Sequence, residues 1–292
     1  MLFGKRKNVI GPDIILIIAA TIWGFGFVAQ KEGMQHLGPY AFNTIRFLLG
    51  ALFVFIIASL KDLGFITKIK KKELIKGSAL GFVLFLAISF QQTGLLYTTA
   101  SNGGFITGLY VIMVPALGFL MWRKKTGIWS VAGSILATIG LYFLSFGSDH
   151  RTDYGDILIL VSTFFWAYHV LLVSKFVAKI DPIKIAFIQF LSCSMFSLFA
   201  LCFKENITLS MITNSSYSLL YTGILSSGVA LTLQIMGQKN ASPTHASIIM
   251  SLECVFAAVG GWLILGELLS VKAIVGCAVM LSGMIISQVK TS

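Results

Sequence analysis

Charged side chains are scarce in this chain of 292 residues, where Asp, Glu, Lys and Arg together make up only 11%. A soluble domain carries about a quarter of such residues, so an ordinary water-exposed surface is excluded. Apolar residues make up 57% of the chain, and the mean hydropathy is +0.89. They fall into runs of about twenty, the length at which an α-helix crosses a hydrocarbon core of about 30 Å. The sequence therefore predicts an all-α integral membrane protein.

Cysteines and catalytic motifs are also few. The four cysteines lie in or at the ends of apolar runs, at Cys193, Cys202, Cys254 and Cys277. With no Cys-x-x-Cys and no histidine pair at ligand spacing, neither a disulfide framework nor a zinc site is indicated. No Ser-His-Asp set or phosphate loop is visible, and the glycine-rich stretches lie in apolar runs, where close helix packing explains them. We expect no enzyme activity, no cofactor and no metal.

The net charge of +11 raises the question of a nucleic-acid partner. Lys and Arg lie almost wholly in the short segments between apolar runs, and no basic stripe interleaved with aromatic residues lies on a solvated element. Their distribution is the one that sets membrane orientation. We therefore expect the bilayer, and no nucleic acid, as the partner of this charge.

Ten spans are predicted, joined by short connections. Their approximate ranges are 13–31, 39–60, 74–97, 101–122, 127–146, 154–178, 182–203, 215–237, 243–265 and 270–289. If the N-terminus is cytoplasmic, 17 of the 22 basic residues lie in inside segments, four lie in outside segments, and Arg46 lies within a span. Because cytoplasmic loops carry the excess of Lys and Arg, we expect a multi-pass protein of the cytoplasmic membrane with both termini inside.

The chain repeats itself at an offset of 143 residues. The matched pairs include Asp13 and Asp156, Trp23 and Trp166, Pro39 and Pro182, Phe47 and Phe190, Gly133 and Gly276, and Gly140 and Gly283. This predicts two five-helix repeats, at 1–148 and 149–292. Because five is odd, the second repeat begins on the opposite side of the membrane, which gives the inverted repeat found in many carriers.

Several local motifs follow the same order as in a known family. They are Ile22-Trp23-Gly24-Phe25-Gly26-Phe27, Pro39 with Arg46, the run from Gly94 to Ser101 continuing to Pro115, and Leu252-Glu253-Cys254-Val255-Phe256-Ala257-Ala258 ending at Gly266-Glu267. In these features the whole chain resembles the ten-helix EamA type of the drug/metabolite transporter superfamily. That family usually has proline after the glutamate, where this chain has Cys254. The resemblance implies transport. Members of that superfamily export amino acids, move nucleotide derivatives, or carry amines and carboxylates.

Two ionisable residues lie deep in predicted spans, where an unpaired charge costs several kcal/mol. Arg46 lies about 10 Å along its span and Glu253 about 15 Å along its own, and they belong to opposite repeats. Arg46 is interpreted either as a snorkelling or carbonyl-capping residue or as part of a site. Glu253 is either a neutral, hydrogen-bonded acid, or a carboxyl that loads and releases a proton, or the ion-pair partner of Arg46.

Further polar and aromatic residues at membrane depth are candidates for binding a solute. These are Trp23, Gln91, Gln92, Asn102, Tyr110, Trp166, His169 and Gln234, to which we add Glu253. For the amides, the competing role is hydrogen bonding between helices, worth about 0.6 kcal/mol each. For the indoles and the lone histidine it is helix packing. The prediction is that most of these nine residues border one cavity between the repeats.

The function expected from these features is secondary transport by alternating access. The solute would be a small polar or amphipathic metabolite, such as an amino acid or a related amine, with protons as a candidate coupling ion. The alternative is a non-transporting membrane protein, either a lipid-facing enzyme or an assembly factor. A polar cavity between the repeats would favour transport, and a closed apolar core would favour the alternative. The oligomeric state is left open.

Overall fold

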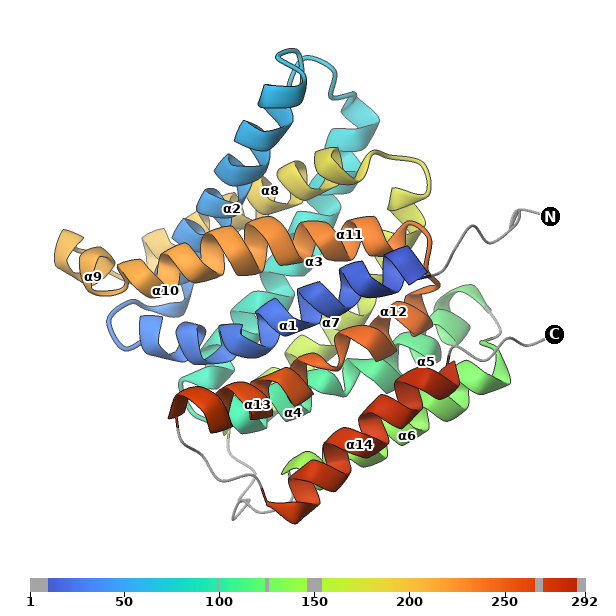
Figure 1. Cartoon of the computed structure of the whole chain (residues 1–292). Helices are drawn as coiled ribbons and strands as arrows, with labels where there is room; N and C mark the ends of the chain where they lie inside the picture. Colours follow the sequence, from blue (N-terminus) through green and yellow to red (C-terminus); the bar gives the residue numbers. More distant parts are fainter. Residues whose placement is uncertain (1–9, 99, 124–125, 146–153, 266–269, 288–292) are drawn as a thin grey trace.

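The structure is a computed structural model that describes residues 10–98, 100–123, 126–145, 154–265 and 270–287. All regular elements in these ranges are helices (Figure 1). In chain order they are α1 (Ile10–Gly33), α2 (Pro39–Lys61), α3 (Lys71–Leu95), α4 (Ala100–Gly108), α5 (Tyr110–Trp122), α6 (Ile128–Ser145), α7 (Tyr154–Val177), α8 (Pro182–Lys204), α9 (Leu209–Asn214), α10 (Ser216–Leu220), the π-helix η1 (Tyr221–Leu231), α11 (Thr232–Gln238), α12 (Pro243–Met250), α13 (Glu253–Leu265) and α14 (Val271–Ser287).

Seven described helical segments are long and apolar enough to cross a membrane. They are Gly11–Gly33, Pro39–Lys61, Lys71–Leu95, Gly103–Trp122, Tyr154–Val177, Pro182–Lys204 and Ser216–Gln238. Three shorter apolar helical segments lie within the remaining predicted spans, at Ile128–Phe143, Pro243–Val259 and Ile274–Ser287. The chain is therefore a multi-pass, all-helical membrane protein.

Proline marks the start of three helices. Pro39, Pro182 and Pro243 occupy the first turn of α2, α8 and α12, where the missing amide N–H would have no partner in the helix. The start of α2 receives its cap from the other repeat, because both carboxylate oxygens of Glu205 accept amide hydrogens of the first turn, at 3.0 and 2.8 Å. Asp181 caps α8 in the usual way, from the residue just before the helix.

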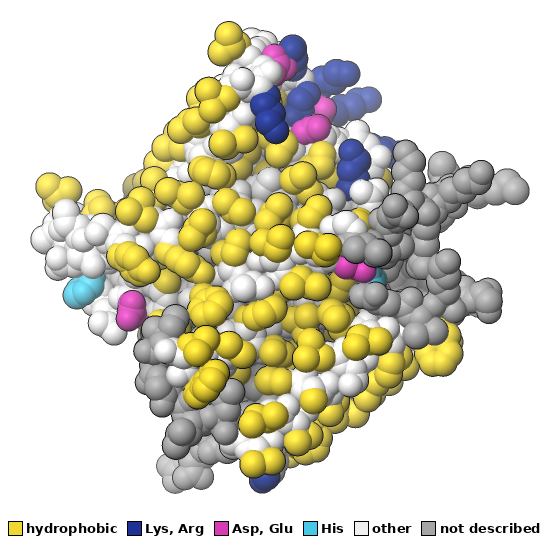
Figure 2. Space-filling view, viewed as in Figure 1, with side chains coloured by type: hydrophobic (Ala, Val, Ile, Leu, Met, Phe, Trp, Pro, Cys, Tyr) yellow, Lys and Arg dark blue, Asp and Glu magenta, His cyan; other side chains and the backbone are white. Residues whose placement is uncertain are grey.

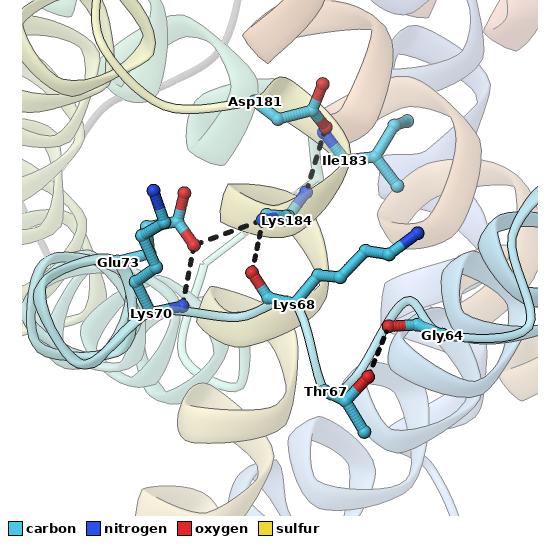
Figure 3. A network of polar contacts seen from close by, with 8 residues as sticks. All are labelled: Gly64, Thr67, Lys68, Lys70, Glu73, Asp181, Ile183 and Lys184. Atoms are coloured by element: carbon cyan, nitrogen blue, oxygen red, sulfur yellow. Dashed lines mark hydrogen bonds and ion pairs between the residues drawn. The ribbon is translucent and has the colours of Figure 1, made fainter.

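Charged side chains gather at one end of the molecule, whereas apolar side chains cover most of the face shown in Figure 2. The connection between α2 and α3 carries several exposed lysines, and Lys184 of α8 reaches it. The ammonium of Lys184 donates to the carbonyl of Lys68 at 2.7 Å and pairs with Glu73 at 3.2 Å (Figure 3). This network joins the two repeats at the end of the molecule that is predicted to be cytoplasmic.

Three predicted spans are interrupted in the structure. The fourth span is divided at Leu109 between α4 and α5, and the ninth is divided at Ser251 and Leu252 between α12 and α13. The eighth contains the eleven-residue π-helix η1. Interrupted helices are tolerated at membrane depth where they are buried in protein or line a cavity. These interruptions therefore direct attention to the centre of the bundle.

Helices α6 and α14, the last of each repeat, pack antiparallel along one side of the bundle (Figure 1). The Cα of Gly133 faces the carbonyl of Gly283, and the Cα of Gly140 faces that of Gly276. Gly133 and Gly276 are repeat mates, as are Gly140 and Gly283. Each of the two glycines of α6 therefore contacts the repeat mate of the other glycine of α6. Crossed pairing of this kind is what a two-fold relation between the repeats produces.

The first helix of each repeat packs mainly with helices of the other repeat. Helix α1 packs against α10, η1, α11, α12 and α13, which we name the α1 bundle together with α1 itself. Helix α7 packs against α3, α4 and α5, and these four helices form the α7 bundle. Each bundle thus combines the first helix of one sequence repeat with helices of the other repeat. The pairs α2/α8 and α6/α14 flank them.

Candidate solute-binding cavity

A cavity lies between the α1 bundle and the α7 bundle. It offers about 50 Å³ to the centres of water-sized spheres, which is room for several water molecules. Its wall includes seven of the residues singled out in the sequence: Trp23, Arg46, Gln91, Tyr110, Trp166, Gln234 and Glu253. They come from α1, α2, α3, α5, α7, α11 and α13, so the wall takes side chains from both repeats.

Two pairs of repeat mates line this cavity. Trp23 and Trp166 are mates, as are Gln91 and Gln234, and all four line the wall. The indole N–H of Trp166 donates to Oε1 of Gln91 at 3.1 Å, and that of Trp23 donates to the carbonyl of Ser226 at 3.1 Å. Because their N–H groups are bonded to the protein, the indoles present mainly apolar ring surface at fixed orientations.

Arg46 brings a buried positive charge to the wall, with only 3% of its surface exposed. Its guanidinium donates to Oε1 of Gln30 at 3.0 Å, and longer contacts of 3.3 and 3.5 Å reach the hydroxyls of Ser227 and Ser226. The guanidinium carbon also lies 4.9 Å from the centre of the Phe47 ring. These partners are neutral, so they hold the arginine in place without cancelling its charge.

Glu253 is the first residue of α13, at the interruption of the ninth span, and is 5% exposed. Its carboxyl lies next to the hydroxyl of Tyr110, but that hydroxyl has no well-formed hydrogen bond. No ion pair joins Glu253 to Arg46 among the residues that the structure describes. The cavity wall therefore holds a basic and an acidic group that are not directly paired.

Two buried polar atoms on the wall have no hydrogen-bond partner within the protein: the hydroxyl of Tyr110 and Oε1 of Gln234. The amide nitrogen of Gln234 is already used, since it donates to Oε1 of Gln238 at 3.1 Å. A buried polar atom without a partner costs about 1–3 kcal/mol. Both atoms are therefore available to bond a polar molecule that enters the cavity.

Two predicted site residues lie away from the wall. Gln92 is buried with its amide nitrogen 3.1 Å from the sulfur of Met34, and His169 is buried with Nε2 3.0 Å from Oε1 of Gln189. Both side chains therefore contact other parts of the protein, as in the competing role of packing and hydrogen bonding within the bundle. Asn102 lies in α4, but its side chain is outside the described residues.

The sequence analysis missed Gln30, Thr107 and Ser226, which also line the cavity. Gln30 is an amide in an apolar run, the signal that selected Gln91, and should have been chosen. Thr107 lies in α4 just before the interruption at Leu109, which the sequence does not reveal. Ser226 lies inside the π-helix, where a face cannot be assigned from the 3.6-residue period.

The structure also brings together a serine, a histidine and an aspartate that lie far apart in the sequence. Nε2 of His245 lies 2.9 Å from Asp13, and Nδ1 lies 3.4 Å from the hydroxyl of Ser287. The three side chains are buried and do not line the cavity, and Ser287 donates to the carbonyl of Met284 at 2.7 Å. The set connects the start of α1 to α12 and to the end of α14.

Comparison with known proteins matches this architecture to a family twice in succession. The model of the EamA-like transporter family matches residues 11–146 and again residues 153–288. The chain belongs to the EamA-like transporter family. The family assignment confirms the resemblance seen in the sequence, including its two-repeat form, and it points to transport and away from enzyme activity.

Individual EamA-like relatives carry transporter names. A protein of Archaeoglobus fulgidus named "uncharacterized transporter" is 32% identical over 95% of this chain and 86% of its own length. The transporter YoaV of Bacillus subtilis is 22% identical over 92% and 93% of the two chains. A crystal structure with 15% identity superposes with a TM-score of 0.79 over 95% of this chain and 96% of that chain, which shows the shared fold.

Proposed function

We propose that the protein is a secondary carrier that moves a small polar metabolite through this cavity by alternating access. Family membership supports transport. The observation that supports this cavity as the site is that its wall holds a buried basic group, a buried acidic group and two unpartnered polar atoms, drawn from both repeats. A non-transporting protein has no need for such a costly set at membrane depth. The proposal includes ten crossings, as two inverted repeats at 1–148 and 149–292.

The chemistry of the wall favours a zwitterion of the amino-acid type. Arg46 offers a positive charge to a carboxylate, and its planar guanidinium suits that group. Glu253 and Oε1 of Gln234 accept hydrogen bonds and suit an ammonium group. Trp23 and Trp166 add apolar ring surface for the rest of the solute. An amine without an acidic group would satisfy only half of this wall.

Ligand-induced stabilisation tests the solute class. Purified protein in nanodiscs is heated with amino acids, with the corresponding amines, and with the corresponding acids that lack the amino group. A ligand bound only by the folded state at 100 times its Kd adds about 2.7 kcal/mol of stability. We expect this shift for zwitterions alone, and its loss in Arg46→Gln. Equal shifts with amines and zwitterions would refute the role of Arg46.

Proton coupling through Glu253 is part of the proposal. In liposomes, Glu253→Gln keeps the shape of the side chain but cannot carry charge. It should stay folded and still bind the solute, more weakly because the amide oxygen accepts a hydrogen bond without a charge, and it should lose the dependence of uptake on a pH gradient. Full uptake driven by a pH gradient in this variant would exclude Glu253 as the coupling residue.

The orientation in the cytoplasmic membrane is tested by cysteine labelling in a variant without the native cysteines. We propose that the connection at 61–72 faces the cytoplasm, as do both termini, and that position 150 faces outward. The termini and His150 lie outside the described residues. A cysteine at 150 labelled only from the cytoplasmic side would overturn the inverted arrangement.

A further inference from the structure

Two links between the α1 bundle and the α7 bundle, made of three hydrogen bonds, lie near opposite ends of α1. Near its end, the ammonium of Lys31 donates to the backbone carbonyl of Thr98, just before α4, at 2.9 Å. Near its start, the amide of Gln238 donates to the carbonyl of Val170 at 3.0 Å and to the hydroxyl of Ser174 at 3.1 Å, both in α7.

The start of α1 is placed beside Gln238 by the neighbouring glycine. The Cα of Gly237 faces Leu16 and the carbonyl of Pro12 so closely that a Cβ there would lie 2.8 Å from Leu16. Pro12 and Lys31 are 19 residues apart in one helix, which at 1.5 Å per residue is about 29 Å. The two links are thus separated by about the thickness of a hydrocarbon core, with the cavity between them.

The two links also occupy equivalent places in the two repeats. Position 31 corresponds to position 174 at the offset of 143, so Lys31 is the mate of Ser174. One link joins the end of α1, the first helix of the first repeat, to Thr98, just after the third span of that repeat. The other joins α7, the first helix of the second repeat, to Gln238 at the end of the eighth span, which is the third span of that repeat. The chemistry differs, since one link has a charged donor and the other a neutral amide.

We propose that these links are the two gates of the carrier, one at each face, and that they set which side the cavity opens to. The inference rests on the proposed function. Opening toward the face of Lys31 requires the Thr98 link to break, and opening toward the face of Gln238 requires the link to α7 to break. Two other hydrogen bonds near these links play a different role. His245 binds Asp13 within the α1 bundle, and the hydroxyl of Thr98 donates to Asp156 of α7, so neither bond joins one bundle to the other.

Gln238 also connects its gate to the solute. Its Oε1 accepts from the amide nitrogen of Gln234, whose own oxygen is unpartnered on the cavity wall. A donor group of the solute that bonds to Gln234 would therefore act on a side chain one hydrogen bond from the gate. The link of Lys31 has no amide at the matching position, because the repeat mate of Gln238 is Leu95.

The test measures access to the cavity from each face without needing the solute. Ser226 on the cavity wall is replaced by cysteine in a background without the four native cysteines. A membrane-impermeant maleimide is applied to right-side-out and to inverted vesicles, and the two labelling rates are compared. Lys31→Met removes one link, and Gln238→Leu removes the other. A hydrogen bond from a charged group contributes about 1.5–3 kcal/mol, so its loss should change the ratio of rates about tenfold or more.

We expect Lys31→Met to increase labelling from the face of Lys31 at the expense of the other, and Gln238→Leu to do the reverse by about threefold for each bond lost. Two control variants keep a gate bond. Lys31→Arg still donates to Thr98, and Ser174→Ala leaves the Val170 carbonyl as an acceptor, so their shifts should be absent or smaller. Size-exclusion profiles check folding.

Two different failures are distinguishable. If the reporter reacts from both faces but neither Lys31→Met nor Gln238→Leu changes the ratio, the gates are refuted while alternating access stands. The same holds if Lys31→Arg shifts the ratio as much as Lys31→Met. If the cysteine at 226 reacts from neither face in any variant, the proposed transport through this cavity is overturned, and the gates with it.

Discussion

The contact between α1 and α13 leaves no room for a side chain at Gly24, and this carries a direct prediction. A Cβ at Gly24 would lie 2.5 Å from Cβ of Phe256, 2.7 Å from the carbonyl of Glu253 and 2.8 Å from the amide nitrogen of Ala257. Ordinary contact begins at 3.4 Å. Two of these atoms belong to the backbone, so Gly24→Ala must push the helices apart by several tenths of an ångström.

The magnitude follows from two opposing effects. Alanine gains up to about 1 kcal/mol over glycine in helix propensity. Overpacking typically costs about 1–3 kcal/mol, and here rigid backbone has to move, so the upper part of that range applies. Gly26 is the matched control in the same helix, because its Cβ would meet atoms no closer than 3.8 Å. Gly26→Ala should therefore be neutral or stabilising.

Thermal unfolding of the two variants in one detergent decides the matter. Gly24→Ala should unfold several degrees below the parent, because about 1 kcal/mol corresponds to roughly 2–4 °C in larger domains. It should also weaken solute binding, because the displaced carbonyl belongs to Glu253 on the cavity wall. If Gly24→Ala unfolds at or above the parent temperature, the close α1–α13 contact is wrong.

Two further predictions concern the ends of the helices. Glu205→Gln should lower stability by about 1 kcal/mol in thermal unfolding, because the neutral amide caps the start of α2 with a single oxygen. Lys68 donates to exposed Asp62 and so lowers the pKa of that carboxyl. The resulting small stabilisation is present above the ordinary pKa of 3.8 and is lost as the pH falls through the lower folded value. Asp62→Asn should therefore unfold slightly earlier than the parent at pH 7, and the difference should disappear as the pH falls through the lowered pKa of Asp62, as measured by thermal unfolding across pH.

The helices and the repeat could be predicted because their signals are local or periodic. The apolar runs mark the helices, and proline at Pro39, Pro182 and Pro243 marks three of their starts. The shift of 143 residues gives the repeat, which the two family matches confirm. The exchange of helices between the two bundles could not be predicted, because sequence similarity shows which segments correspond and not which segments touch.

The residues of the candidate site also divide into those that the sequence identifies and those that it does not. Depth in an apolar run identified Arg46 and Glu253, because an ionisable group there needs a special environment. The same criterion also selected His169, whose Nε2 bonds to Oε1 of Gln189 within the protein, away from the cavity. Cost at membrane depth shows that a polar residue must be bonded, but the partner can be a neighbouring helix as well as a solute. Only the arrangement in space separates the two.

The departure at Cys254 tests whether the interruption of the ninth span needs a proline. The interruption is present without one, since α12 ends at Met250 and α13 begins at Glu253. Cys254 therefore lies in the first turn of α13, where proline is tolerated.

In Cys254→Pro, the lost contacts would be the amide bond to the carbonyl of Ser251 at 3.1 Å and the thiol contact to Gly104 at 3.2 Å. We expect this variant to remain folded and to lose about 1–2 kcal/mol, since each hydrogen bond contributes about 1 kcal/mol. Ile248→Pro, inside α12, should cost about 3 kcal/mol or more, because a proline there clashes with the preceding turn. Equal losses in thermal unfolding would mean that α12 and α13 behave as one continuous helix. A clear difference would show that α12 and α13 are separate helices, with the interruption that places Glu253 on the cavity wall lying between them.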